Sequence, residues 1–205
     1  MRTGTAQQYG WPFGLAAALT IFLLAPSPTM AQTGEADELP ARTAEETAAD
    51  LQIVLDRHLT ESRCENPDTQ LMRSFEPIVA RLSETAILYA IPCTAGAYNI
   101  AYRLYMRETG EIGGVETLYF ATWLGEYGWG GTDLLYNIDV DGPRLSAFYK
   151  GRGLGDCGTD ARWIWRDYAY RLVRFAAQDD CNGVTAENWP VLFAYPGGSM
   201  DGSAK

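Results

Sequence analysis

The feature that most constrains the fold is a succession of short segments, each rich in aromatic and aliphatic residues, between Ile87 and Ala194. Glycine, aspartate and asparagine separate these segments, and no helical periodicity lies between them. This pattern predicts short β-strands joined by turns. We expect about eight strands, at 87–91, 99–106, 115–123, 134–138, 144–149, 162–165, 168–175 and 191–194.

Strands that follow one another without intervening helices favour antiparallel pairing. Asp141 and Gly142, between two of the expected strands, are typical of a tight hairpin turn, because glycine supplies the positive φ that such a turn requires. We therefore predict an α+β fold that is predominantly antiparallel β, either a sandwich or a partly open barrel. One amphipathic helix near the N-terminus is expected to cover one side.

That helix is expected to begin at Thr43. Thr43 and Glu46 have the spacing of a capping box, in which the hydroxyl and the carboxylate each satisfy a free amide group at a helix start. The turn-forming pair Asn66 and Pro67 predicts an end near Arg63. The apolar stripe of the helix consists of Leu51, Val54, Leu55 and Leu59.

Residues 71–82 fit two periodicities. Their apolar side chains match helical spacing, yet Ile78, Ala80 and Leu82 alternate as they would in a strand. We favour a strand after Pro77.

The first residues have the layout of a signal peptide. Arg2 precedes an apolar run at 13–24, which is too short to cross a bilayer, and small side chains lead to Ala31. We predict cleavage after Ala31, export to the periplasm and no stable membrane anchor afterwards. The expected organisation is a signal peptide at 1–31, a flexible acidic leader at 32–42, one domain at 43–196 and a disordered tail at 197–205.

The chain has four cysteines, and an even number in an exported protein predicts disulfides. Three pairings are possible. We favour Cys64 with Cys93 and Cys157 with Cys181, because each pair closes a loop of about 25 to 30 residues, worth about 3 kcal/mol. A zinc site is disfavoured, since no C-x-x-C pair exists and His58 is far in sequence from the later cysteines. We expect no metal and no cofactor.

The balance of charge argues against nucleic acid as a partner, because 26 acidic residues face 16 basic ones. The charge is uneven. Residues 32–84 hold 12 acids and 5 bases, whereas residues 142–178 hold 7 bases and 3 acids. One face is therefore expected to be locally basic.

The most unusual segment is 150–158, K-G-R-G-L-G-D-C-G, with four glycines in nine residues at the end of an expected strand. Phosphate-binding glycine loops lead into a helix, whereas a cysteine and another strand follow here, so nucleotide binding is disfavoured. The structural interpretation is a demanding loop, with glycines at positive φ and Asp156 accepting hydrogen bonds from amides. The functional interpretation is a recognition loop, which the disulfide keeps rigid while Lys150 and Arg152 face a carboxylate or phosphate.

Tryptophans suggest two further candidates. Trp163 and Trp165 share one face of a strand and are expected in the core, with a platform for a sugar or peptide as the alternative and Arg162 as its hydrogen-bond donor. Trp129, between glycines, is expected at a mobile loop tip or as a plug at the end of a sandwich.

Residues suited to catalysis are few. His58 lies on the apolar side of its helix and is interpreted as half-buried packing, not as a base. Asp156 and Asp160 are a conceivable carboxylate pair for glycan hydrolysis but are interpreted as turn formers. Asp139 and Asp141 resemble the start of a calcium loop without its later ligands, so they are assigned to a hairpin.

Seven short sequence blocks together carry a resemblance to a known family. The blocks are I-P-C at 91–93, G-A-Y-N at 96–99, K-G-R-G-L-G-D-C-G at 150–158, W-x-W at 163–165, R-L at 171–172, C-x-G at 181–183 and W-P at 189–190. They resemble an exported bacterial family catalogued as domain of unknown function 1176. The resemblance spans about Thr85 to Ala194, and one departure is Cys93-Thr94-Ala95, where a bulkier aromatic residue is expected before Gly96. It implies an envelope protein of Gram-negative bacteria and implies no reaction.

From these features we expect a non-enzymatic binding or inhibitor-like module with an envelope protein or a cell-wall component as its partner. The expected binding residues are Lys150, Arg152, Asp156, Arg162 and Trp129. The alternative is a hydrolase that acts on envelope glycans or peptides, and a purely structural envelope component is the third hypothesis.

Overall fold

The computed structural model describes residues 44–61, 63–66, 69–110 and 113–196. The predicted signal peptide, acidic leader and tail, and the predicted cap at Thr43, lie outside the described residues. No helix in the described ranges has both the length and the apolar character needed to cross a membrane.

The single α-helix of the described residues, α1 (Ala44–Glu61), packs on one sheet. Val54 is fully buried there, against Tyr89 and Tyr105, and Leu51 and Leu55 pack beside it. Leu59 was expected on this apolar stripe but is 58% exposed, and His58 occupies the buried position instead. The helix ends at Glu61, close to the predicted end.

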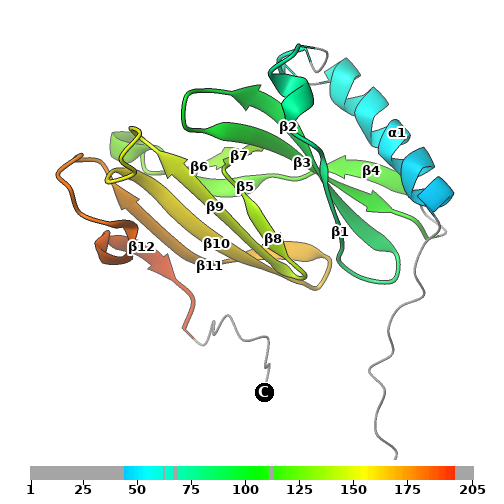
Figure 1. Cartoon of the computed structure of the whole chain (residues 1–205). Coiled ribbons are helices and arrows are strands. Elements are labelled where there is room, and N and C mark those ends of the chain that lie inside the picture. The colour runs from blue at the N-terminus through cyan, green and yellow to red at the C-terminus, as the bar shows by residue number, and fades with distance from the viewer. Residues whose placement is uncertain (1–43, 62, 67–68, 111–112, 197–205) are drawn as a thin grey trace, which may run out of the picture. The chain divides into compact units, whose positions relative to one another are not determined.

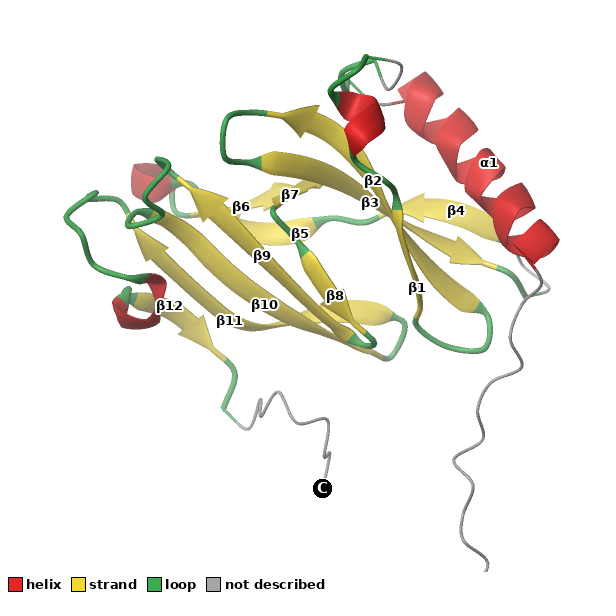
Figure 2. Cartoon of the chain, viewed as in Figure 1, coloured by secondary structure: helices red, strands yellow, loops and turns green. Residues whose placement is uncertain are grey.

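The strands form three antiparallel sheets (Figure 1). The first sheet has the order β1-β2-β3-β4, with β7 also paired to β3, the second has the order β12-β11-β10-β9-β8, and β5 pairs with β6. The connections of the described residues include three short 3-10 helices, at Met72–Ser74, Gly125–Tyr127 and Ala186–Asn188. They are coloured red, like α1, in Figure 2. The strands are β1 (Ile78–Arg81), β2 (Ala86–Ala95), β3 (Ile100–Glu108), β4 (Gly114–Thr117), β5 (Phe120–Trp123), β6 (Trp129–Thr132), β7 (Leu134–Tyr136), β8 (Asp139–Asp141), β9 (Arg144–Lys150), β10 (Gly158–Arg166), β11 (Ala169–Gln178) and β12 (Val191–Ala194).

Strand β2 shows why the first sheet is so apolar. Ile87 and Tyr89 face α1, whereas Leu88 and Ala90 face the core shared with the second sheet. Because successive side chains point to opposite faces, covering both faces produces the uninterrupted apolar run seen in the sequence.

The main core lies between the two five-stranded sheets. Leu88 and Leu104 of the first sheet belong to the same buried cluster as Leu145, Trp163 and Phe175 of the second. The predicted class, antiparallel β with one N-terminal helix, is confirmed, and the sheets form no closed barrel.

The described residues contain twelve strands, more than the eight or so expected. Two of the additional strands are β1, which follows Pro77, and β8, which forms one side of the expected hairpin. The other two have separate causes. The segment expected as one strand at 115–123 divides into β4 and β5, which belong to different sheets. The glycine-rich segment at 129–132 pairs as β6, although glycine has low strand propensity.

Two local predictions are confirmed. Asp141 and Gly142 lie in the β8–β9 hairpin, where Asp141 pairs with Arg144 and Gly142 has φ of 54°. A strand, β1, follows Pro77.

Candidate functional site

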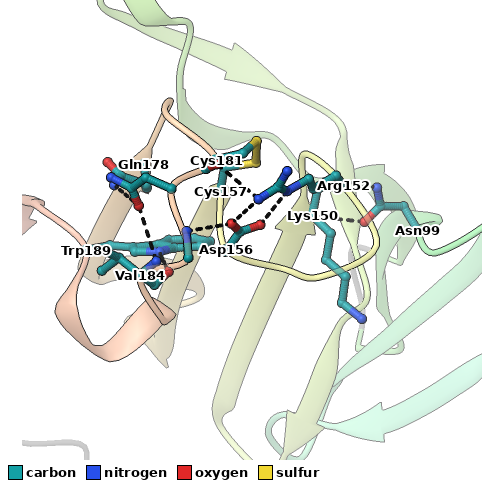
Figure 3. The surroundings of a disulfide bond; sticks show 11 residues. Asn99, Lys150, Arg152, Asp156, Cys157, Gln178, Cys181, Val184 and Trp189 are labelled. Atoms are coloured by element: carbon teal, nitrogen blue, oxygen red, sulfur yellow. Dashed lines mark hydrogen bonds and ion pairs between the residues drawn. A yellow bond between two sulfur atoms is a disulfide. The ribbon is translucent and has the colours of Figure 1, made fainter.

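Two disulfides tether the chain, one between a connection and a strand and the other between two loops. Cys64, just after α1, is bonded to Cys93 of β2, and Cys157 is bonded to Cys181 beyond the end of β11. These are the two pairs expected from the sequence. The Cys157–Cys181 bond lies at the base of the loop between β9 and β10, which we call the glycine loop (150–158) (Figure 3).

The backbone of the glycine loop is tightly turned. The Gly151 amide donates to the Cys157 carbonyl at 2.8 Å, and the Gly155 amide donates to the Arg152 carbonyl at 2.9 Å. Gly155 has φ of 68° and Gly158 has φ of 133°, where a Cβ atom would lie 1.9 Å from the Tyr149 carbonyl oxygen. Position 158 admits only glycine, and the positive φ at position 155 favours glycine, so the sequence encodes this loop conformation.

An ion pair inside the loop reinforces this conformation. The guanidinium of Arg152 donates to both carboxylate oxygens of Asp156, at 2.7 and 2.5 Å, and also to the Cys181 carbonyl at 3.0 Å. Asp156 is only 6% exposed, and it accepts a further bond from the Gly183 amide at 2.7 Å. Arg152 first, and then Gly183, hold the pKa of the Asp156 carboxyl well below its usual range.

This arrangement changes the part that Arg152 plays. Its guanidinium was expected to face a bound anion, but in the structure it braces the loop, since it bonds to Asp156 in bidentate geometry. The Asp156 carboxylate lies within 4.8 Å of both sulfur atoms, but the two sulfurs are bonded to each other and so offer no thiolate to a metal ion.

A clamp from the other sheet fixes the first residue of the loop. The Asn99 side chain donates to the Lys150 carbonyl at 2.8 Å and accepts from the Lys150 amide at 3.0 Å. Asn137 donates to the Asn99 side chain at 2.8 Å. Two of the sequence blocks that carry the family resemblance, 96–99 and 150–158, therefore meet in space.

The glycine loop offers fewer unpaired charged side chains to a partner than its sequence suggested. Leu154, at the tip, is 80% exposed, and the half-exposed ring of Tyr98 lies beside Gly153. The stem of Lys150 runs past Gly155, and no ion pair joins its ammonium group to any described residue. In the sequence, a leucine between two glycines could have indicated this exposed tip, but Leu154 was not among the expected binding residues.

Beside the loop lies a groove of about 440 Å³. Its walls come from the glycine loop and from the segment after Cys181, which is packed down by Trp189 stacked on Phe148. Among the described residues that line it, Asp156 and Glu187 are charged and none is basic. A hydrogen bond from Thr185 lowers the pKa of Glu187. The groove itself therefore does not offer the positive charge expected for anion binding.

Arg162 shares the outer face of the second sheet with the glycine loop. In β10, Arg162 lies four residues beyond Gly158, so about 13 Å of strand separates Arg162 from Gly158. Gly158 pairs with Lys150 on the neighbouring strand. Asp160 lies between them and pairs with both Arg162, at 3.5 Å, and Arg174. It was expected in a turn but lies in β10. Asp156 and Asp160 are thus each held by arginine, which disfavours a hydrolytic carboxylate pair.

Trp129 lies apart from the other candidates. It begins β6, and its ring packs edge-on against Trp123 at 5.6 Å and against Phe175 at 5.1 Å. Because Phe175 faces the core, Trp129 is on the opposite side of the second sheet from Lys150 and Arg162. Trp129 is 45% exposed, so its ring is packed on one side and open to solvent on the other, and its place in β6 differs from the expected loop tip.

The histidine and the other tryptophans are packing residues. His58 is 1% exposed, and its Nδ1 lies 3.0 Å from the Tyr105 hydroxyl. Burial, and then the charge of Arg103, lower the pKa of His58 to about 4. Trp163 is buried in the core as expected, whereas Trp165 is half-buried against Tyr170.

Comparisons with known proteins give a family but no activity. The family described as protein of unknown function (DUF1176) matches residues 14–196. The uncharacterized protein YpfG of Escherichia coli (strain K12) is 31% identical over 134 residues, which cover 56% of this chain and 34% of YpfG. The chain thus spans about a third of the length of this relative. No solved structure matches the chain.

Proposed function

The chain belongs to the family described as protein of unknown function (DUF1176), and from this premise we propose that it is a non-enzymatic binding module of the periplasm. The glycine loop is its recognition element, and an envelope protein is its partner. Two disulfides and the apolar run at 13–24 support export into an oxidising compartment.

One observation carries the proposal: the glycine loop is held in shape before any partner arrives. The Cys157–Cys181 bond, the Arg152–Asp156 ion pair and the Asn99 clamp all act on a segment of nine residues. A loop that is already ordered loses little conformational entropy on binding, so its contacts translate into affinity. Disulfide-braced loops with an exposed apolar tip suit inhibitor-like docking into a pocket of another protein.

In this proposal, Leu154 is the residue that contacts the partner. A side chain exposed to 80% contributes little to folding, yet it places apolar surface at the tip of a rigid loop. Buried apolar anchors supply much of the energy of protein–protein interfaces. Lys150 and Tyr98 flank it, as one cation and one aromatic ring.

Site-directed photo-crosslinking tests the proposal. A benzophenone amino acid replaces Leu154 in one sample and Asp139, an exposed residue of β8, in the control. Both proteins are irradiated in a periplasmic extract of E. coli. A discrete adduct is expected at position 154 and none at 139.

Competition then shows whether the adduct reports recognition. Unlabelled wild type and Leu59→Asp, the same substitution at another exposed leucine, should suppress the adduct, and Leu154→Asp should not. Equal competition by Leu154→Asp, or no adduct at 154, would contradict the proposal. Release of soluble fragments from purified sacculi, abolished by Asp156→Asn, would favour the hydrolase instead.

A further inference from the structure

A second cavity lies on the core side of the second sheet, away from the glycine loop's outer face. It has a volume of about 420 Å³ and lies among β5, β6, β7, β9, β10 and β11. Its floor is made of buried residues, among them Trp163 and Phe175, and its rim of exposed ones, among them Leu124, Tyr149 and Asp179. We call it the aromatic cleft. Its size is that of a small-molecule site.

The walls of the aromatic cleft are aromatic and firmly packed. Tyr136 and Tyr149 lie ring to ring at 5.0 Å on one side. On the other side Trp123 and Phe175 are both backed by Trp129, which does not itself line the cleft. A ligand would therefore meet the rings of a preformed site.

The charge that lines the aromatic cleft is negative. Among the described residues that line it, Asp179 is charged and no lysine, arginine or histidine is present. No ion pair joins Asp179 to any described residue. It lies between the end of β11 and Cys181, so the Cys157–Cys181 bond holds this carboxylate near the rim.

These observations select a class of ligand. Aromatic faces carry partial negative charge and attract cations, and a nearby carboxylate adds to that attraction. The apolar floor requires an apolar body, and the net charge of −10 on the whole chain disfavours anions further. We propose that the aromatic cleft binds a small amphiphilic cation, such as an alkylammonium ion, with its ammonium group at Asp179 and its chain between Tyr149 and Phe175.

Three probes with one tail and different head groups test this proposal. Octylamine, 1-octanol and octanoate are titrated into the full mature protein at pH 7 and at low ionic strength, with tryptophan fluorescence and calorimetry as readouts. Octylamine is expected to bind about tenfold more tightly than octanol, the size of one cation–π contact with one opposite charge. Octanoate is expected to bind most weakly.

A pair of neighbouring acids supplies the matched variants. Asp179→Asn should abolish the preference for octylamine over octanol and leave octanol binding unchanged. Asp180→Asn makes the same charge change next door, at a residue that does not line the cleft, and should retain the preference. Tyr149→Ala, at an exposed position of the rim, should weaken all three probes, and thermal melts check that each variant is folded.

The inference fails if octylamine and octanol bind equally, if Asp179→Asn retains the preference, or if no probe binds. It does not depend on recognition by Leu154, which lines no part of the cleft. A loop that captures no partner would therefore leave this result unaffected.

Discussion

The two disulfides tether regions that are held in opposite ways. Around Cys64–Cys93, α1 lies on the first sheet through apolar contacts, and a neutral His58 is buried in that interface. Around Cys157–Cys181, a loop with almost no apolar packing is held by an ion pair, two glycines and a side-chain clamp. Rigidity in the first region comes mainly from burial, to which the Asp50–Arg107 ion pair and a hydrogen bond from Arg57 to the Val115 carbonyl are added. Rigidity in the second region comes from directional bonds. In the second region the exposed apolar side chain, Leu154, lies at the tip of the braced loop.

The largest effect is expected from the glycine loop backbone. Gly158→Ala places a methyl group 1.9 Å from the Tyr149 carbonyl oxygen at a positive φ, so the end of β9 or the start of β10 must move. We expect a loss of at least about 4 kcal/mol in the free energy of unfolding. Urea unfolding measures it. Gly131→Ala, where no atom lies within 4 Å of the added methyl, is the control and should change little.

Removing each disulfide in turn compares the two regions directly. The bonds span 29 and 24 residues, so each double Cys→Ser variant should lose about 3.5 kcal/mol. The local effects should differ, because packing still holds α1 in the first variant. Hydrogen exchange should therefore increase in the glycine loop without Cys157–Cys181, but remain slow in α1 without Cys64–Cys93. An equal increase in hydrogen exchange in both regions would contradict this difference between them.

The helix region is expected to respond to mild acid. His58 has a pKa of about 4 in the folded protein and about 6.5 when unfolded, so the unfolded chain binds more protons between these values. Stability should fall by about 2 to 3 kcal/mol as the pH drops from about 6.5 to about 4. In His58→Gln this pH dependence should be reduced, whereas Leu59→Gln at the exposed neighbour should retain it.

The glycine loop should respond only at lower pH. The pKa of Asp156 is depressed in the folded protein, so its stabilising contribution is present above the unfolded value of about 3.9 and is lost as the pH falls through the folded value. The difference in melting temperature between wild type and Asp156→Asn should be the smallest of these effects, constant from pH 5 to 8 and shrinking below about pH 4. A difference that already shrinks at pH 6 would show that the ion pair does not form.

The fold was predictable because its signals are local. Strand propensity located β2, β3 and β9, glycine located the β8–β9 turn, and loop length favoured the two cysteine pairs. Strand β6 was missed because its glycines pair only in the presence of β5. Strand propensity is a property of single residues, so it does not include pairing with a neighbouring strand.

The sites were less predictable, because their partners are distant in sequence. The glycine loop was singled out by its composition, but the clamp from Asn99 joins residues 51 positions apart. Arg152 was expected to face an anion, because the sequence shows its charge but does not show that its guanidinium bonds to the Asp156 carboxylate. The residues that line the aromatic cleft come from several strands that are distant in sequence, so no single sequence motif indicates the cleft.

Hydrogen exchange of three amides tests whether the glycine loop is ordered before it binds a partner. Gly151, Gly155 and Gly183 donate to Cys157, Arg152 and Asp156, respectively. In the free, oxidised protein at neutral pH these amides should exchange far more slowly than in an unstructured peptide, and they should lose that protection in the variant without Cys157–Cys181. Exchange at unstructured-peptide rates in the oxidised wild type would contradict the account.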